Sequence, residues 1–266
     1  MPDQQKYTNK LSGKNILIIG GTSGIGFAVA EASLEFGAHI TLASSRPSRL
    51  SHALSRLQTA YPSASSRIST HAVDLANEKT LEANLTALLD TVTHHAAPAH
   101  KLDHIVYTAG DTLPHQSLAA TDFDVAKQGG VVRFFGPLLL GKHAPRYMNA
   151  GPASSVVLTM GVAAEKPIVG TSGFAVVGGL QMLTRNLALE NAPVRCNLVS
   201  PGAVETELWE DFPTEAQEAM RVACGRLPTG GVGRVEDVAE AYLYAMRDEF
   251  LTGTMISTNG GALLMG

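Results

Sequence analysis

A glycine-rich run, GGTSGIG at residues 20–26, is the part of this 266-residue chain that points most clearly to chemistry. It directly follows the apolar run NILII at residues 15–19 and opens a segment with helical periodicity at residues 25–36. Glycines in such a loop let the backbone approach a pyrophosphate, and the N-terminus of the next helix supplies free N–H groups and a positive dipole end. The strand–loop–helix context therefore predicts a dinucleotide site rather than a glycine turn without a ligand.

The residues after the second apolar segment indicate which nucleotide is bound. After residues 38–43 the chain continues with Ser44, Ser45 and Arg46. An acidic residue here would accept a hydrogen bond from a ribose 2′-hydroxyl, whereas an Arg beside two hydroxyls suits a 2′-phosphate. The sequence thus favours NADP(H) over NAD(H), and the alternative is that Arg46 is only a solvated loop charge.

Further motifs make the chain resemble the short-chain dehydrogenase/reductase family over nearly its whole length. They are VDL at residues 73–75, YTAG at 107–110, SPGAVET at 200–206, GRVEDVA at 233–239 and NGG at 259–261. YTAG differs in its first two positions from the NNAG of the family. The residues expected to contact the cofactor are Gly20, Thr22, Ser23, Gly24, Ile25, Gly26, Ser44, Ser45, Arg46, Asp74, Leu75, Ala109, Gly110, Pro201, Gly202, Val204 and Thr206.

The catalytic tetrad of that family, Asn, Ser, Tyr and Lys, is missing from this chain. None of the six Tyr residues is followed by a Lys four positions later. Aligning the motifs places Gly130, Gly161, Phe174 and Gly178 at the Asn, Ser, Tyr and Lys positions. Because hydride addition to a ketone leaves an alkoxide that needs a proton donor, ordinary ketone reduction is disfavoured.

An iminium substrate would remove the need for that proton donor, because it is already cationic and becomes a neutral amine on hydride addition. A site for it needs orientation and charge complementarity. The chain is similar to the fungal NADPH-dependent reductase/Diels–Alderases of prenylated indole alkaloid pathways, whose tetrad is likewise eroded. The resemblance implies reduction of a cyclic, diketopiperazine-type iminium and then guidance of an intramolecular [4+2] cycloaddition. An atypical carbonyl reductase with a substitute acid and a catalytically silent NADP(H)-binding scaffold or sensor are the alternatives.

Two charged residues match positions that are implicated in the fungal branch. An acidic residue in the loop after the fifth strand corresponds to Glu165, where the branch often has the shorter Asp, and an Arg on the preceding helix corresponds to Arg133. Glu165 would stabilise the cation or move a proton, or else it forms a surface ion pair with Lys166. Arg133 would orient Glu165 or polarise a substrate carbonyl, or else it lies on a helix surface or an interface.

Three more residues are candidates for the catalytic end of the site. Asp111 follows the YTAG motif and is expected near the nicotinamide pocket or, equally, as a loop cap. Phe174 and Trp209 are expected at the substrate, where Trp209 stacks on a flat, apolar molecule or packs instead against Phe212. The spacing of the clustered histidines fits no metal site, so no metal is expected.

Alternating strands and helices must position these side chains. Strands are predicted at residues 15–19, 38–43, 69–73, 103–107, 154–159, 194–199 and 254–257. Helices are predicted at residues 25–36, 47–60, 78–92, 122–143, 174–190 and 235–247. Glycines and a proline predict a kink or break within 122–143, and residues 201–228 predict a mobile insertion of short helices over the site. The strict alternation predicts one α/β domain over residues 1–266, a Rossmann fold with a doubly wound, seven-stranded parallel sheet.

Composition limits the partners and the compartment. A net charge of −4 without a basic stripe argues against nucleic acid, and the apolar runs are too short to span a membrane. A polar start without a signal peptide and only two cysteines make the cytoplasm the expected location. The partners expected are a bulky, apolar small molecule and a second copy of the chain. The helix with Gly178, Gly179 and Met182 matches the self-association surface of the family, which implies a homodimer or homotetramer.

Overall fold

The computed structural model describes residues 4–94, 101–110 and 117–265. Seven strands form one parallel sheet in the order β3-β2-β1-β4-β5-β6-β7. Their bounds are β1 Asn15–Ile19, β2 His39–Ser44, β3 Ile68–Ala72, β4 His104–Tyr107, β5 Ser155–Thr159, β6 Arg195–Pro201 and β7 Met255–Thr258. The predicted doubly wound sheet is therefore confirmed, with strand ends shifted by one or two residues.

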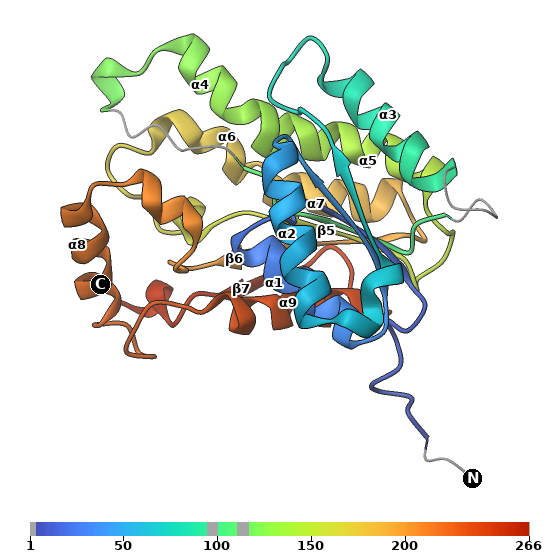
Figure 1. Cartoon of the computed structure of the whole chain (residues 1–266). Helices are drawn as coiled ribbons and strands as arrows, with labels where there is room; N and C mark the ends of the chain where they lie inside the picture. Colours follow the sequence, from blue (N-terminus) through green and yellow to red (C-terminus); the bar gives the residue numbers. More distant parts are fainter. Residues whose placement is uncertain (1–3, 95–100, 111–116, 266) are drawn as a thin grey trace.

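Helices cover both faces of the sheet, as Figure 1 shows. One face packs against α1 Gly24–Glu35, α2 Pro47–Ala60 and α9 Val235–Arg247, and the other against α3 Leu81–His94, α5 Gly136–Tyr147 and α7 Leu180–Glu190. Successive residues of a strand point to opposite faces, so Ile16 and Ile18 join the first core while Leu17 and Ile19 join the second. This double burial explains why β1 is apolar at four successive positions.

The helix predicted over residues 122–143 is broken by a π-helical segment. It consists of α4 Phe123–Gly130, the π-helix η3 Val131–Phe135 and then α5. The hydroxyl of Tyr107, at the end of β4, donates a hydrogen bond to the carbonyl oxygen of Val132 at 2.7 Å. A Cβ on Gly136 would collide with that hydroxyl, so glycine lets the strand end meet the helix backbone here. Such π segments often occur at functional sites.

The single helix predicted over residues 174–190 is wrong in its first part. The chain forms a 3-10 turn, η5 Ser172–Phe174, then the short α6 Ala175–Gly178, and only then α7. Gly178 and Gly179 weaken the helix locally. The N–H of Gly179 bonds the carbonyl oxygen of Val176, a tighter turn than an α-helix makes, and a Cβ on Gly179 would lie 3.0 Å from the ring of Phe134. The close approach of η3 therefore accompanies the break.

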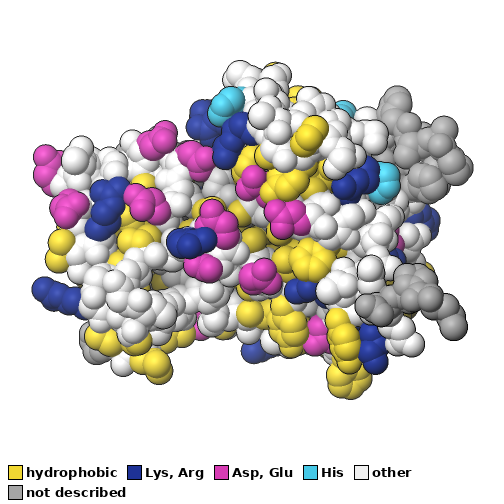
Figure 2. Space-filling view, turned by 60° about the horizontal axis from the view of Figure 1, so that its bottom comes forward, with side chains coloured by type: hydrophobic (Ala, Val, Ile, Leu, Met, Phe, Trp, Pro, Cys, Tyr) yellow, Lys and Arg dark blue, Asp and Glu magenta, His cyan; other side chains and the backbone are white. Residues whose placement is uncertain are grey.

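The insertion after β6 forms short helices at the end of the sheet where α4 and α6 also lie (Figure 1). They are η6 Glu207–Asp211 and α8 Thr214–Cys224, as predicted for residues 201–228. The remaining short turns are η1 Pro62–Arg67, η2 Leu118–Ala120, η4 Val162–Ala164 and η7 Ala262–Leu264. Within the described ranges, no helix combines the length and the apolar character needed to cross a membrane. On the face in Figure 2, acidic and basic side chains are interspersed.

Candidate active site

The loop after β1 is shaped by contacts that only glycine allows. Gly20 has a φ of +94°, and a Cβ on it would lie 2.5 Å from the backbone nitrogen of Ala109. A Cβ on Gly26 would collide with the carbonyl oxygen of Gly20 and with the hydroxyl of Thr108. Gly24 has a φ of +51°, which L side chains rarely adopt. The loop thus brings the N-terminus of α1 to the carboxyl edge of the sheet, the geometry of a phosphate cradle.

The carboxyl ends of β2 and β3 carry the residues predicted for the adenosine half of the nucleotide. The hydroxyl of Thr22 donates to Oγ of Ser44 at 3.3 Å, and the exposed Arg46 is the residue before α2. After β3, the carboxylate of Asp74 accepts a hydrogen bond from the backbone N–H of Ala76 at 2.9 Å. Hydroxyls, a guanidinium and a carboxylate therefore lie along the edge at which this fold binds dinucleotides.

The segment after β6 closes the other side of the loop. A Cβ on Gly202 would lie 2.8 Å from Cα of Asn259, so glycine is required where the chain leaves Pro201. Val204 is buried and forms an isolated parallel bridge with Gly233. These contacts join three of the motifs found in the sequence, SPGAVET, GRVEDVA and NGG, into one support for the nicotinamide side of the cleft.

Glu207 contacts the phosphate cradle, which the sequence did not predict. Thr206 packs against Gly24, whose Cβ would lie 3.0 Å from Cγ2 of Thr206. The next residue, Glu207, accepts a hydrogen bond from the backbone N–H of Gly24 at 2.8 Å. A carboxylate is favoured at a helix N-terminus by the same partial positive charge that favours phosphate. No local pattern marks this contact, because it joins residues 183 positions apart.

Glycines stand at two of the lost tetrad positions, and no described atom crowds the space beside them. Among the described residues, a Cβ on Gly161 would meet no atom within 4 Å, and a Cβ on Gly178 would meet only Cβ of Ala164, at 3.9 Å. No described side chain therefore fills the Ser and Lys positions of the family. The side chain of Phe174 and the whole of Asp111 lie outside the described residues.

Neither tyrosine near the strand ends replaces the missing one. Tyr107 is buried, and its hydroxyl is engaged with the carbonyl oxygen of Val132. Tyr242 is fully buried on α9, with its hydroxyl 2.7 Å from Oγ1 of Thr159. Burial raises the pKa of Tyr242 well above its ordinary value. These two hydroxyls are therefore not placed to protonate a substrate in the cleft.

Arg133 extends from the π-helical segment η3 to the carboxyl end of β4. Its guanidinium carbon would lie 2.5 Å from a Cβ on Gly110, so the cation packs directly on the end of the YTAG motif. The side chain is half-buried. The guanidinium thus lies at the strand edge rather than on the outer surface of the helix, which was one of the two alternatives considered for it.

Glu165 lies just after η4 and is hydrogen-bonded to a residue near the end of β6. Its Oε1 accepts a hydrogen bond from Oγ of Ser200 at 2.7 Å, and Ser200 is fully buried. The neighbouring Lys166 donates instead to the carbonyl oxygens of Ala262 (3.2 Å) and Met265 (2.5 Å). Within the part of the chain that the structure describes, Glu165 pairs with neither Lys166 nor Arg133. The carboxylate therefore faces the sheet edge. Among the described residues, the surface ion pair with Lys166, which was the alternative considered for Glu165, is not formed.

Trp209 is enclosed by the insertion that carries it. It is 7% exposed, and the guanidinium of Arg221, on α8, lies 5.9 Å from the centroid of its ring. The same Arg221 pairs with Glu205 at 2.6 Å. This environment favours packing within the insertion over stacking on a substrate. The ring contact recorded for Trp209 among the described residues is with Arg221, rather than with the Phe212 ring considered from the sequence.

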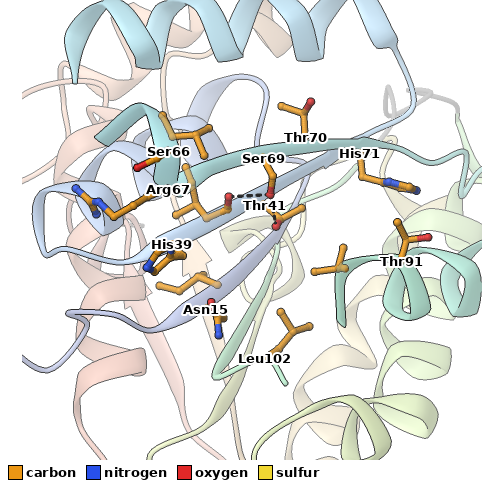
Figure 3. A pocket seen from close by; sticks show the side chains of 14 residues that line it. Asn15, His39, Thr41, Ser66, Arg67, Ser69, Thr70, His71, Thr91 and Leu102 are labelled. Atoms are coloured by element: carbon orange, nitrogen blue, oxygen red, sulfur yellow. Dashed lines mark hydrogen bonds between the residues drawn. The ribbon is translucent and has the colours of Figure 1, made fainter. Parts of the chain in front are cut away.

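A cavity of about 340 Å³ lies away from this edge, against β1, β2, β3 and α3 (Figure 3). Polar side chains of β2 and β3 line it, including Thr41 and Ser69, whose hydroxyl oxygens lie 2.7 Å apart. His39 and His71 flank that pair. Ligands of doubly wound sheets bind beyond the carboxyl ends of the strands, whereas this cavity reaches back to the first residues of β1 and β2. It is therefore not the candidate active site.

Fold and site together define a Rossmann-type enzyme with a nicotinamide dinucleotide cradle. The chain matches the SDR-like Rossmann domain over residues 7–265, and it belongs to the short-chain dehydrogenase/reductase family of oxidoreductases. It is 40% identical over 270 residues to the short-chain dehydrogenase/reductase malC of Malbranchea aurantiaca, covering 99% of this chain and 100% of that one. It is 42% identical over 256 residues to the short-chain dehydrogenase/reductase ATR9 of Stachybotrys chlorohalonatus, covering 96% and 98% of the two chains.

Solved structures agree with these relatives. The MalC reductase/Diels–Alderase from Malbranchea aurantiaca superposes with a TM-score of 0.89 at 39% identity, covering 98% of this chain and 100% of that one. A small-chain dehydrogenase solved in complex with NADPH superposes with a TM-score of 0.72 at 27% identity, covering 96% and 100%. The predicted Rossmann fold, the enzyme class and the resemblance to the fungal branch are thereby confirmed, and the fold is one that binds a nicotinamide cofactor.

Proposed function

We propose that this enzyme is an NADPH-dependent reductase of a cyclic iminium of the indole-alkaloid or diketopiperazine type. One observation carries the proposal: an intact dinucleotide cradle faces a catalytic end that has lost its proton donors and retains a carboxylate, Glu165, bonded to the end of β6. A cation needs a counter-charge and no acid, whereas a ketone needs an acid. The name of its relative, a reductase/Diels–Alderase, supports the further proposal that the site then guides an intramolecular [4+2] cycloaddition.

The choice of NADP(H) rests on the adenosine end of the cleft. Ser44, Ser45 and Arg46 follow β2 where an NAD-dependent enzyme would carry an acidic residue, and Thr22 bonds Ser44 beside them. A guanidinium with neighbouring hydroxyls can bind a 2′-phosphate through several charge-assisted hydrogen bonds. The NADPH complex of a related fold is consistent with this choice. A nicotinamide bound at the end of β6 would supply the hydride.

The acidic and the basic residue of the catalytic end would then have different roles. The carboxylate of Glu165 would stabilise the cationic substrate, which loses its charge as it is reduced. The guanidinium of Arg133, at the end of β4, would donate hydrogen bonds to a carbonyl of the substrate ring. The open positions at Gly161 and Gly178 would leave room for a bulky ring system. Asp111, Phe174 and Trp209 stay candidates for contacts around that ring.

Self-association is part of the proposal. Large apolar side chains are exposed on α5 and α7, among them Leu138, Met182 and Leu189, of which Leu189 is 79% exposed. Exposed apolar side chains on neighbouring helices are typical of a subunit interface. We therefore propose a homodimer or homotetramer through these helices, which light scattering of the purified protein would measure and which Met182→Glu should weaken.

Transfer of deuterium from 4-deuterated NADPH in a single turnover tests the reaction. The acceptors are a cyclic, indole-bearing iminium and the matched ketone. Label on the iminium carbon and none on the ketone is the expected result, after which the product is searched for a cycloadduct. Label on the ketone would replace the proposal with a carbonyl reductase. Label on neither, with NADPH bound, would overturn it in favour of a scaffold or sensor.

A further inference from the structure

We infer that Ser200 is a positioning residue, which holds the Glu165 carboxylate in place for a cationic substrate. This inference rests on the proposed function, in which Glu165 is the counter-charge. The contact that carries it is the 2.7 Å hydrogen bond from Oγ of Ser200 to Oε1 of Glu165.

Ser200 is built into the rigid part of the fold. It lies one residue before the end of β6 and is fully buried, and it pairs across the sheet with Ser257 of β7. The strand alternates, so Ser200 shares its face with Leu198 and Cys196, which belong to the core under α7. A hydroxyl in such a place needs a hydrogen-bond partner, and the Glu165 carboxylate is the acceptor that it has.

The loop that carries Glu165 borders the position of the lost lysine. Ala164, the preceding residue, supplies the one described atom within 4 Å of a Cβ on Gly178. The following residue, Lys166, is held in a different direction, by the carbonyl oxygens of Ala262 and Met265. Glu165 is thus turned toward the sheet while its neighbour is tied to the C-terminal segment.

One carboxylate oxygen is committed and the other is available. Among the hydrogen bonds of the described residues, Glu165 uses Oε1 for Ser200 and makes none through Oε2. A glutamate side chain loses considerable rotamer freedom when it is fixed, so an anchor in place before the substrate binds lowers the cost of placing the charge. Ser200 would supply that anchor without touching the substrate.

Binding of a stable cation tests the inference apart from turnover. The probe is a cyclic N,N-dimethylammonium ring bearing an indole, with the isosteric neutral carbon analogue as its control, both titrated calorimetrically. We expect Ser200→Ala to weaken binding of the cation by about tenfold, because the freed carboxylate must then be ordered when the cation binds. Binding of the neutral ring should be unchanged. Ser200→Thr, which keeps the hydroxyl, should restore binding, and Ser257→Ala on the neighbouring strand is the matched control.

A double-mutant cycle separates positioning from a structural effect. If Ser200 acts through Glu165, Ser200→Ala combined with Glu165→Gln should bind the cation no more weakly than Glu165→Gln alone. NADPH affinity should stay within error for all of these variants. Each variant should still unfold in one cooperative transition above the temperature of the titration, although the loss of a buried hydrogen bond or an added methyl group lowers the midpoint. Additive losses, a Ser200→Ala variant that binds like the wild type, or a wild type that does not distinguish the cation from the neutral ring would each overturn the inference.

The proposed function and the positioning role of Ser200 can be disproved independently of each other. If the wild type transfers no deuterium to the iminium but binds the cation through Ser200 and Glu165, the reaction is wrong and the positioning role stands. If it transfers deuterium and the cycle is additive, the reaction stands and the positioning role is wrong.

Discussion

Along the cofactor cradle, from its phosphate end to its nicotinamide side, a Cβ on Gly20, Gly26 or Gly202 would meet backbone atoms. At the catalytic end, by contrast, no described atom lies closer than 3.9 Å to a Cβ on Gly161 or Gly178. Glycine at the first three positions is required by shape, because the backbone itself forms the cradle. Glycine at the other two removes the side chains that carry the chemistry of the family. Nucleotide recognition therefore depends on a geometry that tolerates no side chain, while the reaction depends on side chains that can be exchanged individually.

The largest expected difference is between adding one methyl group at the phosphate end of the cleft and adding one at its catalytic end. Gly26→Ala should weaken NADPH binding by about a hundredfold, the equivalent of the roughly 3 kcal/mol that overpacking costs, because the N-terminus of α1 must shift. Gly178→Ala should leave NADPH affinity unchanged and stabilise the protein by up to about 1 kcal/mol, since alanine favours the helix. Fluorescence titration and thermal unfolding measure both. Equal effects at the two glycines would contradict the comparison.

Acid stability sets the pH range in which the two ends can be compared. His104 lies at the amino end of β4 and is fully buried, with its Nδ1 2.9 Å from Oγ of Ser155. This burial lowers the pKa of His104 to about 3. Below the unfolded pKa of about 6.5 the unfolded chain binds a proton that the folded chain excludes, so stability falls as the pH falls, by about 2 kcal/mol at pH 5. Urea unfolding should show that His104→Gln loses less free energy of unfolding between pH 7 and pH 5 than the wild type does. The same difference in wild type and variant would exclude His104 as the cause.

Glu207 should make a smaller difference, confined to the phosphate end. Its carboxylate accepts the N–H of Gly24 that a pyrophosphate would also use, and it adds negative charge beside the cradle. Glu207→Gln should therefore tighten NADPH binding by about two- to fivefold, the range of a helix-terminus charge effect. Glu205→Gln, two residues earlier and paired with Arg221, is the matched control. Weaker binding by the Glu207 variant would mean that the carboxylate supports the cradle rather than competing for it.

The smallest effect is expected from restoring half of the lost tetrad. Phe174→Tyr with Gly178→Lys returns the Tyr and Lys of the family, but Gly130 and Gly161 still lack the Asn and Ser side chains. We expect no measurable gain in ketone reduction, followed by NADPH absorbance. A large gain would show that the catalytic end is otherwise conventional and would favour the carbonyl reductase.

Most of the fold could be predicted from local patterns. The apolar run of β1 and the glycines after it identify strand, loop and helix within twelve residues or so, because burial on both faces and a tight turn each leave a local mark. The break between α6 and α7 was missed. Two glycines in succession weaken a helix, but whether it breaks depends on Phe134 of the facing segment, which no local pattern reveals.

The site was predictable in its parts and not in its contacts. Glu165 and Arg133 were candidates from the family resemblance, and Arg133 was expected either to orient Glu165 or to polarise a substrate carbonyl. Among the described residues, no hydrogen bond or ion pair joins the two side chains. From the sequence, Ser200 was recognised only as part of a motif, and Glu207 was not a candidate. Their contacts join residues 35 and 183 positions apart, so they depend on how strands and loops are packed together.

By itself, the sequence determined that this chain builds a dinucleotide cradle and lacks the Tyr–Lys pair of its family. Both depend on residue types and on short spacings along the chain, so both can be recognised from the sequence alone. Only the tertiary structure decided where the remaining charges lie: Arg133 against Gly110, Glu165 on Ser200, Glu207 on the first turn of α1. A long side chain can reach several partners, and the one that it meets is selected by the packing of elements far apart in the chain.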